Sequence, residues 1–157
     1  GGGGAHLREK IVAAASDQML VIADAGKEVA QLGAFPLPLE VLGFGHTATM
    51  RLIGQALAGL GYTVPAMALR AGPEGPFCTD EGNHVIDLAL GRIADPQALA
   101  AALLAVPGVV ETGLFSGLCS AVLIGHEDGR VSARAPGGAG LQQVAINLDE
   151  ALAQAAG

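Results

Sequence analysis

The sequence predicts an α/β protein with a parallel-sheet portion, into which a β-α-β-β-α-β unit of the split α+β type is inserted. Two patterns support this class. Residues 19–23 form a short apolar run that stops at Asp24, as expected of a strand buried on both faces in a parallel sheet. Farther along, strand patterning alternates with two segments of helical apolar spacing, as expected of helices that cover one face of an antiparallel sheet. With 157 residues, 51% of them hydrophobic, the chain can bury a core.

The first segment is expected to be a glycine turn followed by a helix. Residues 1–4 are all glycine and predict a turn that is either flexible or closely applied to a ligand. Leu7, Ile11 and Ala15 then recur at helical spacing. The helix is expected to end near Asp17.

The inserted unit is expected over residues 37–119, after a break marked by two prolines. Its strands are expected at residues 39–44, 63–69 and 109–115, with a hairpin over residues 77–90 that turns at residues 81–83. One helix is expected to start at the N-cap candidate Thr47 and to end at Gly59 and Gly61. The other should start at Asp95-Pro96, because Asp caps a helix and Pro fits its first position.

The chain is expected to return to the parallel sheet over residues 120–131, so that this segment and residues 1–36 form one portion. Residues 132–140 are rich in Gly, Ala and Pro and predict a linker. Within residues 132–157, a docked C-terminal helix is expected from the apolar residues that share one helical face: Leu141, Val144, Ala145, Leu148 and Leu152. The alternative is a frayed, Ala-rich tail.

Composition and charge argue against several classes of protein. No apolar run approaches the ~20 residues of a membrane helix, and the first residues lack a secretion-signal layout, so a cytoplasmic location is expected. The net charge is −7 and the eight Lys and Arg residues are scattered, which argues against nucleic-acid binding. Cys78 and Cys119 have no Cys or His at ligand spacing, so they are expected to be free thiols rather than metal ligands.

Because the chain opens in a glycine run without Met, it is expected to be truncated, processed or incomplete.

Four segments of the chain carry a resemblance to a known family. They are Gly1 to Lys10, where glycines run into Arg-Glu-Lys; Ile22 to Lys27 with the Leu-Gly and Phe-Pro-Leu-Pro-Leu-Glu-Val runs after it; Thr79 to Asn83; and Pro107 to Phe115. In order and spacing they resemble the type A ribose-5-phosphate isomerases, over roughly residues 1–130 and the C-terminal three fifths of that family. Four ordered matches are far more specific than one Gly-rich loop.

The resemblance implies that the parallel-sheet portion is the remnant of a Rossmann-like catalytic domain. It also implies an aldose-ketose isomerase of the pentose phosphate pathway, which interconverts D-ribose 5-phosphate and D-ribulose 5-phosphate through an enediolate. No metal or organic cofactor is implied. The lysine that precedes the glycine loop in the family, its phosphate cradle and its Asp-rich sugar-binding turn do not occur in these residues, which puts the activity of this chain alone in question.

The same resemblance assigns roles to individual residues. Glu9 matches the general base and Lys27 a substrate-contacting lysine, while Gly1, Gly2 and Gly3 match loop positions whose backbone approaches the sugar phosphate. A carboxylate near a carbon acid is what proton transfer through an enediolate needs. Lys27 follows a predicted strand at the sheet edge where α/β ligands bind, so it is expected to converge with the glycine loop on one concave site.

Taken without the resemblance, these residues have simpler interpretations. Glu9 and Lys27 would most simply be solvated, as Arg8 and Lys10 are still expected to be, and these last two are not assigned to the site. Asp80, Glu81 and Asp87 are explained by the turn chemistry and solvated face of a hairpin. His46 is expected to bond locally rather than to bind phosphate, and His6, His84 and His126 are weaker candidates still.

Two other functions remain open from the sequence. One is a non-catalytic sugar-phosphate-binding or sensor fragment of the same fold, although no DNA-binding segment is visible and the retention of Glu9 favours an enzyme. The other is a structural fragment whose α+β unit serves as an oligomer interface. The expected partners are a small sugar phosphate and further copies of the chain in a dimer or tetramer, with no nucleic acid and no membrane.

Overall fold

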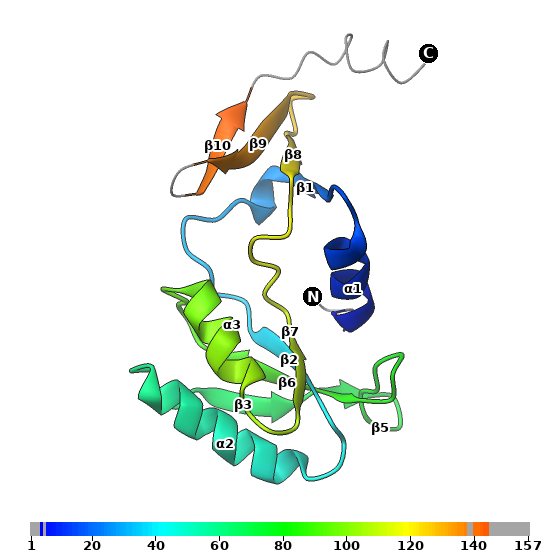
Figure 1. Cartoon of the computed structure of the whole chain (residues 1–157), viewed down its shortest axis with the longest axis vertical. Coiled ribbons are helices and arrows are strands. Elements are labelled where there is room, and N and C mark those ends of the chain that lie inside the picture. Colours follow the sequence, from blue (N-terminus) through cyan, green and yellow to red (C-terminus); the bar gives the residue numbers. More distant parts are fainter. Residues whose placement is uncertain (1–3, 5, 138–139, 145–157) are drawn as a thin grey trace. The chain divides into compact units, whose positions relative to one another are not determined.

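The structure is a computed structural model that describes residue 4, residues 6–137 and residues 140–144 (Figure 1). Its contacts divide the chain into two compact units, Gly1–Val12 with Ala30–Ser116 and Ala13–Val29 with Gly117–Gly157. We call them the antiparallel unit and the mixed unit after their sheets. Helix α1 (Leu7–Ala15) begins in the first and ends in the second. The domain boundaries expected from the sequence place residues 1–12 with the parallel sheet, and they remain a prediction.

The antiparallel unit is built on a four-stranded sheet in the order β3-β6-β2-β7. Its strands are β2 (Leu37–Val41), β3 (Ala66–Leu69), β6 (His84–Ala89) and β7 (Val109–Thr112), and each neighbouring pair is antiparallel. A small hairpin of β4 (Ala71–Gly72) and β5 (Gly75–Pro76) lies between β3 and β6 in the chain. The element order therefore confirms the expected β-α-β-β-α-β pattern, apart from this extra hairpin.

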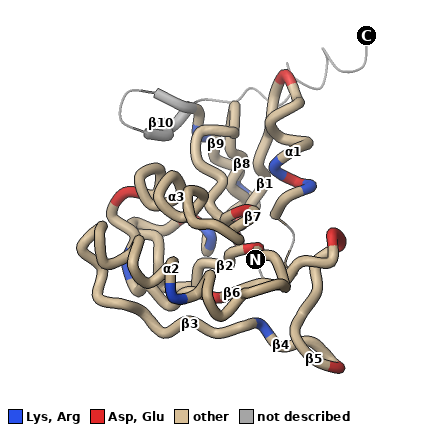
Figure 2. The backbone as a smooth tube through the Cα atoms, turned by 60° about the horizontal axis from the view of Figure 1, so that its bottom comes forward, with Lys and Arg blue, Asp and Glu red and all other residues tan. Residues whose placement is uncertain are grey.

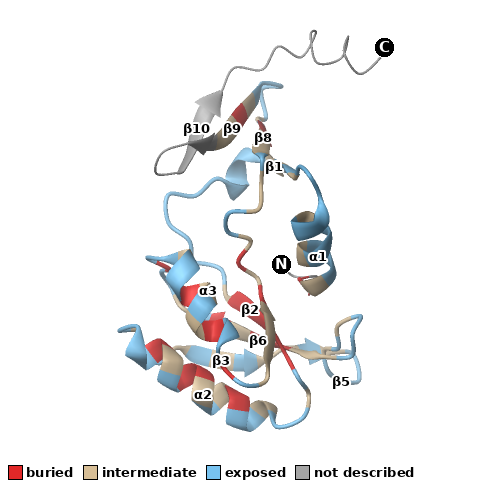
Figure 3. Cartoon of the chain, viewed as in Figure 1, coloured by how far each residue is buried: buried red, intermediate tan, exposed pale blue. Residues whose placement is uncertain are grey.

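Helices α2 (His46–Gly59) and α3 (Pro96–Leu104) form the core together with this sheet. All five residues of β2 are buried, as the red stretch in Figure 3 shows. Leu39 and Val41, both 0% exposed, belong to one apolar cluster with the helical stripe residues Ile53, Leu57 and Leu103. Successive strand residues point to opposite faces, so Glu40 lies on the other face of the sheet. The central strand thus has an apolar side and a polar side.

The expected N-cap of α3, Asp95, is confirmed, whereas the expected N-cap of α2, Thr47, is wrong. Asp95 accepts hydrogen bonds from the backbone N–H groups of Gln97 (3.1 Å) and Ala98 (2.9 Å), with Pro at the first helical position. Helix α2 is instead preceded by Gly45, at a φ of 69°, so the expected cap Thr47 lies inside the helix. A backbone in the left-handed region favours glycine, and here that geometry decides where the helix begins.

The mixed unit contains a four-stranded sheet in the order β1-β8-β9-β10. Strands β1 (Leu20–Asp24) and β8 (Ala121–Gly125) are parallel, which confirms the parallel pairing expected from the apolar run. Leu20 and Ile22 are 55% and 76% exposed, so the expectation of a strand buried on both faces is wrong. Strand β1 lies at the edge of its sheet, and the described residues leave this face uncovered.

The C-terminal part of the described chain differs from the sequence prediction. Strands β9 (Val131–Gly137) and β10 (Gly140–Val144) occupy most of the expected linker and the first residues of the expected helix, and both expectations are wrong there. Strand β9 pairs antiparallel with β8 and β10, so the ladder satisfies its backbone groups despite its Gly, Ala and Pro content. The remainder of the expected helix, residues 145–152, lies outside the described residues.

The mixed α/β class is therefore confirmed, with one mixed and one antiparallel sheet, whereas the Rossmann-like detail remains a prediction. The expected hairpin at residues 77–90 is reduced to strand β6 and an isolated bridge between Cys78 and His84, which encloses the turn. No helix within the described residues is long and apolar enough to cross a membrane.

Neighbouring leucines of α3 offer a matched test of this core. Leu103 is 0% exposed and Leu104 is 45% exposed. Leu103→Ala should lower the free energy of unfolding by about 2–5 kcal/mol because it removes packed methyl groups and leaves a cavity, whereas Leu104→Ala should cost under about 1 kcal/mol. Urea unfolding followed by circular dichroism measures both. Equal losses would contradict the described packing of α3.

Candidate functional site

The segment before α1 is closely packed on the antiparallel unit. Gly4 is buried and has a φ of 71°, in the left-handed region. A Cβ atom added there would lie 2.5 Å from a ring carbon of Phe77, so only glycine fits both the backbone and the space. His6, two residues later, is also buried. Gly4 and His6 are thus closely surrounded by other atoms just before the helix begins.

Glu9 stands in the first turn of α1 and is exposed. It lines a small cavity of about 60 Å³ together with neighbouring residues of α1, Glu40 of β2 and residues 77–81. An accessible carboxylate beside a cavity can accept a proton from a bound carbon acid if the ligand reaches it.

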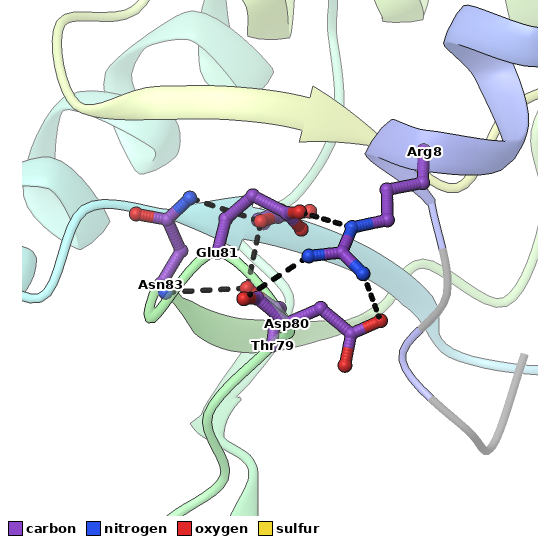
Figure 4. Close-up of polar contacts among 6 residues, drawn as sticks. Arg8, Thr79, Asp80, Glu81 and Asn83 are labelled. Atoms are coloured by element: carbon purple, nitrogen blue, oxygen red, sulfur yellow. Dashed lines mark hydrogen bonds and ion pairs between the residues drawn. The ribbon is translucent and has the colours of Figure 1, made fainter.

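Arg8 joins the start of α1 to the turn at residues 79–83 (Figure 4). Its guanidinium nitrogens lie 3.4 Å from a carboxylate oxygen and 3.4 Å from the carbonyl oxygen of Asp80, and its Nε donates to the carboxylate of Glu81. The hydrogen bond to Glu81 raises the pKa of Arg8. Although the Arg8 side chain is 59% exposed, it is therefore not simply solvated, as the sequence had suggested.

Lys10 makes a second link between α1 and the antiparallel unit. Its Nζ donates to Glu111 Oε1 at 2.6 Å and to the backbone oxygen of Thr112 at 2.9 Å, and it lies 5.0 Å from the ring centre of Phe115. The side chains of Lys10 and Glu111 are only 17% and 12% exposed. The expectation of a solvated Lys10 is wrong, because its partners at the end of β7 are distant in sequence.

Glu40 is a buried carboxylate beside the same cavity and was not among the site residues expected from the sequence. It is 1% exposed, and its Oε1 accepts hydrogen bonds from Thr79 Oγ1 (2.8 Å) and Asn83 Nδ2 (2.9 Å). A buried carboxylate is costly unless it is hydrogen-bonded, so these donors are needed. The signal available in the sequence was a lone carboxylate, Glu40, between Leu39 and Val41 in an otherwise apolar strand.

His6 is buried beside the same cavity, with an exposure of 1%. Neither ring nitrogen has a hydrogen-bond partner in the part of the chain that the structure describes. Burial lowers the pKa of His6, and the positive charge of Arg70 acts in the same direction, while Glu40 and Glu9 oppose it. The imidazole is thus held toward its neutral form, which can both donate and accept.

Charge elsewhere is dispersed. In Figure 2 two of the basic residues, Arg8 and Lys10, share helix α1, and the others are scattered over the rest of the chain. Asp87 pairs with Arg70 at 2.5 Å. Nδ1 of His46 lies 3.2 Å from the backbone oxygen of Gly43, which is the local contact expected of it. Within the described residues, no three His, Cys, Asp or Glu side chains are grouped as a metal site would require.

The remaining site residues expected from the sequence are Lys27 and the first three glycines. Lys27 is exposed and ends the short 3-10 helix η1 (Ala25–Lys27), directly after β1 in the mixed unit. Gly1, Gly2 and Gly3 lie outside the described residues. The convergence of Lys27 with the glycine loop therefore stays a prediction, and so do the roles of Glu9 and these four residues.

Comparison with known proteins gives a consistent match. The sequence profile of the ribose 5-phosphate isomerase A (phosphoriboisomerase A) family matches residues 1–129. Ribose-5-phosphate isomerase A of Ruegeria pomeroyi is 54% identical over 134 residues, covering 85% of this chain and 51% of the relative. A Cereibacter sphaeroides protein of the same name is 50% identical over 151 residues, covering 96% and 58%. The chain spans about half the length of the curated relatives it matches.

Solved structures agree with the sequence relatives. Ribose 5-phosphate isomerase from Plasmodium falciparum superimposes with a TM-score of 0.76 at 28% identity, covering 85% of this chain and 57% of that one. Ribose 5-phosphate isomerase A from Methanocaldococcus jannaschii gives a TM-score of 0.69 at 32% identity, covering 93% and 57%. A further D-ribose-5-phosphate isomerase, solved in complex with phospho-erythronic acid, gives 0.68 at 30% identity, covering 82% and 54%.

The ion pair of Lys10 with Glu111 leads to a stability prediction. Lys10→Met should lower the free energy of unfolding by about 1–3 kcal/mol, because the largely buried carboxylate of Glu111 loses its cation. The double variant Lys10→Met with Glu111→Leu should recover part of this loss. Urea unfolding of the wild type and the variants measures it. A Lys10→Met variant as stable as the wild type would show that the pair does not hold α1.

The lowered pKa of His6 predicts a pH dependence of stability. Above the unfolded value of about 6.5, both folded and unfolded states carry a neutral His6. As the pH falls below this value, the unfolded state binds a proton that the folded state resists, and stability is lost by at most about 1.4 kcal/mol per pH unit until the folded pKa is reached. Unfolding free energies from pH 7 to 5 should therefore fall more steeply for the wild type than for His6→Leu. Parallel curves would contradict the cause assigned here.

Proposed function

This chain belongs to the ribose 5-phosphate isomerase A family, and we propose that the protein containing it interconverts D-ribose 5-phosphate and D-ribulose 5-phosphate. The observation that carries the proposal is the position of Glu9. It lies in the first turn of α1, accessible and beside a cavity, between two residues whose side chains are tied to the antiparallel unit. Such an arrangement suits a carboxylate that must be held still while it transfers a proton.

The proposed reaction needs one base and a set of donors. Glu9 removes the proton from C2 of the open-chain aldose, the electron pair moves into the C1–C2 bond, and the carbonyl oxygen becomes the enediolate oxygen. A proton also passes from the C2 hydroxyl to the oxygen on C1; the C2 carbonyl then forms as the C1–C2 electron pair takes the proton back from Glu9 at C1, which yields the ketose. Donors that face the developing oxyanion stabilise this intermediate. C1 is reduced as C2 is oxidised within one molecule, so no external oxidant or reductant is needed, and the proposal includes no metal or organic cofactor.

The other proposed contacts hold the substrate. Backbone N–H groups of Gly1, Gly2 and Gly3 would approach the sugar phosphate, since glycine lets a ligand come close to the main chain. Lys27 would add a positive charge near it. A related structure was solved with phospho-erythronic acid, and this supports a phosphorylated sugar as the ligand here. The proposal keeps the cytoplasmic location and the homo-oligomer, a dimer or tetramer, that the sequence predicts.

The test of Glu9 requires a protein as long as the curated relatives, because this chain spans about half of their length. We suggest a fusion protein in which the N-terminal half of the Ruegeria pomeroyi relative precedes residue 1. In it, Glu9→Gln keeps the shape of the side chain and should lower kcat by ~10²–10⁴-fold, the usual contribution of a positioned general base, with little change in KM. Ketose formation from ribose 5-phosphate measures both constants. Turnover near that of the unsubstituted fusion would remove Glu9 from the mechanism.

Two controls sharpen this experiment. Glu127→Gln changes an exposed carboxylate in the mixed unit and should leave kcat unchanged. The present chain by itself is expected to show weak or no isomerisation, because misplacement of the substrate alone can lower the reaction rate ~10²-fold. A fusion that binds phospho-erythronic acid but shows no turnover would support the sensor alternative instead.

A further inference from the structure

Helix α1 has little apolar packing to hold it in place. It has nine residues and none of them is buried. Its two largest aliphatic side chains after the first turn, Ile11 and Val12, are 58% and 65% exposed. Isolated helices shorter than ~12–15 residues are marginal in water, so contacts outside the helix must fix it. Two charged side chains near its start, those of Arg8 and Lys10, make such contacts with the antiparallel unit.

We propose that Glu40 and the turn at residues 79–83 are a positioning device for Glu9, acting through Arg8. Glu40 holds the turn, the carboxylates of the turn hold Arg8, and Arg8 holds the helical turn that carries Glu9. None of these residues needs to touch the substrate. The inference rests on the proposed function, because it assigns a purpose to the residues that surround the proposed base.

The first link is the hold of Glu40 on the turn. Thr79 Oγ1 donates to Glu40 at 2.8 Å and also accepts the backbone N–H of Asn83 at 3.2 Å, so one hydroxyl serves both the carboxylate and the turn. The backbone N–H of Thr79 donates to the carbonyl oxygen of Asn83 at 2.8 Å. Gly82 has a φ of 75°, which the turn requires and glycine supplies. Because Glu40 is anchored in the centre of the sheet, the turn is anchored with it.

The second link is the hold of the turn on Arg8. The guanidinium meets the Asp80 carboxylate, the Asp80 carbonyl and the Glu81 carboxylate, as Figure 4 shows. Several contacts to one planar group fix its orientation as well as its position. Exposed ion pairs contribute little to global stability, so the main effect of these contacts should be on the placement of α1. Lys10 gives the helix an independent anchor, and loss of the Arg8 link should therefore be partial.

The inference also gives a purpose to a motif that the proposed reaction does not use. Thr79 to Asn83 was one of the four segments that carried the family resemblance, yet none of its residues is proposed to bind substrate. Within this segment, Thr79 and Asn83 face Glu40, while Asp80 and Glu81 face Arg8. One short turn thus joins the centre of the sheet to the start of α1.

The first experiment uses the 157-residue chain and measures amide hydrogen exchange. Glu81→Gln keeps the size of the side chain and removes the charge that Arg8 meets, and Thr79→Val removes the hydroxyl link. Either change should speed exchange at Ile11 and Val12 about tenfold, while exchange at Ile86 in β6 stays within about twofold. Unchanged exchange in α1, or an equal increase in β6, would overturn the proposal. If Thr79→Val fails to fold, Glu81→Gln alone decides.

A matched control is available in the mixed unit. Asp128 and Arg130 form an exposed ion pair at 2.6 Å in the turn between β8 and β9. Asp128→Asn removes one surface carboxylate, as Glu81→Gln does, and it should leave exchange at Ile11 and Val12 unchanged. Faster exchange in α1 with this control would mean that any loss of surface charge loosens the helix, and would count against a specific role for the turn.

The second experiment separates positioning from a general structural effect. In the fusion protein, Glu81→Gln should lower kcat about tenfold and leave KM within about twofold, because the base is misplaced while substrate contacts survive. In a Glu9→Gln background the same change should have no further effect on kcat. An equal loss in both backgrounds would overturn the proposal. If Glu9→Gln itself keeps full turnover, the proposed function fails, and the exchange experiment still decides the positioning role.

Discussion

The arrangement around α1 depends on a carboxylate buried in the middle of a sheet. Glu40 lies on the central strand β2 and is 1% exposed, where a carboxylate without hydrogen-bond donors would be strongly unfavourable. Its donors come from both ends of the turn at residues 79–83. The need to satisfy this one group therefore brings the turn against the sheet, and the turn in its place meets Arg8.

The same strand divides the antiparallel unit into a structural side and a site side. Leu39 and Val41 pack into the apolar cluster formed with α2 and α3, and Glu40 faces the opposite way. Close packing on the apolar side holds the backbone of β2 rigid, and the polar side chain of Glu40 is therefore attached to a rigid strand. A site built on such a strand is placed more precisely than one built on loops alone.

The proposed chemistry draws on both compact units. Glu9 and its supporting contacts lie in the antiparallel unit, whereas Lys27 follows β1 in the mixed unit. Leu20 and Ile22 expose apolar side chains on one face of β1, whereas the faces of parallel sheets are usually covered by packed helices. The chain spans about half the length of its curated relatives.

Local patterns in the sequence determined the mixed α/β class, the Asp95 cap of α3, the parallel partner strand β1 and the segments that carry the family resemblance, including the position of Glu9. They did not determine β9 and β10, because a composition rich in Gly, Ala and Pro favours a linker, and only pairing with β8 made it a strand. Nor did they identify the partners of Arg8 and Lys10, which lie 73 and 101 residues away in the chain. Propensity and periodicity act over a few residues, whereas the pairing of charges and the satisfaction of a buried carboxylate depend on which distant segments the tertiary structure brings together.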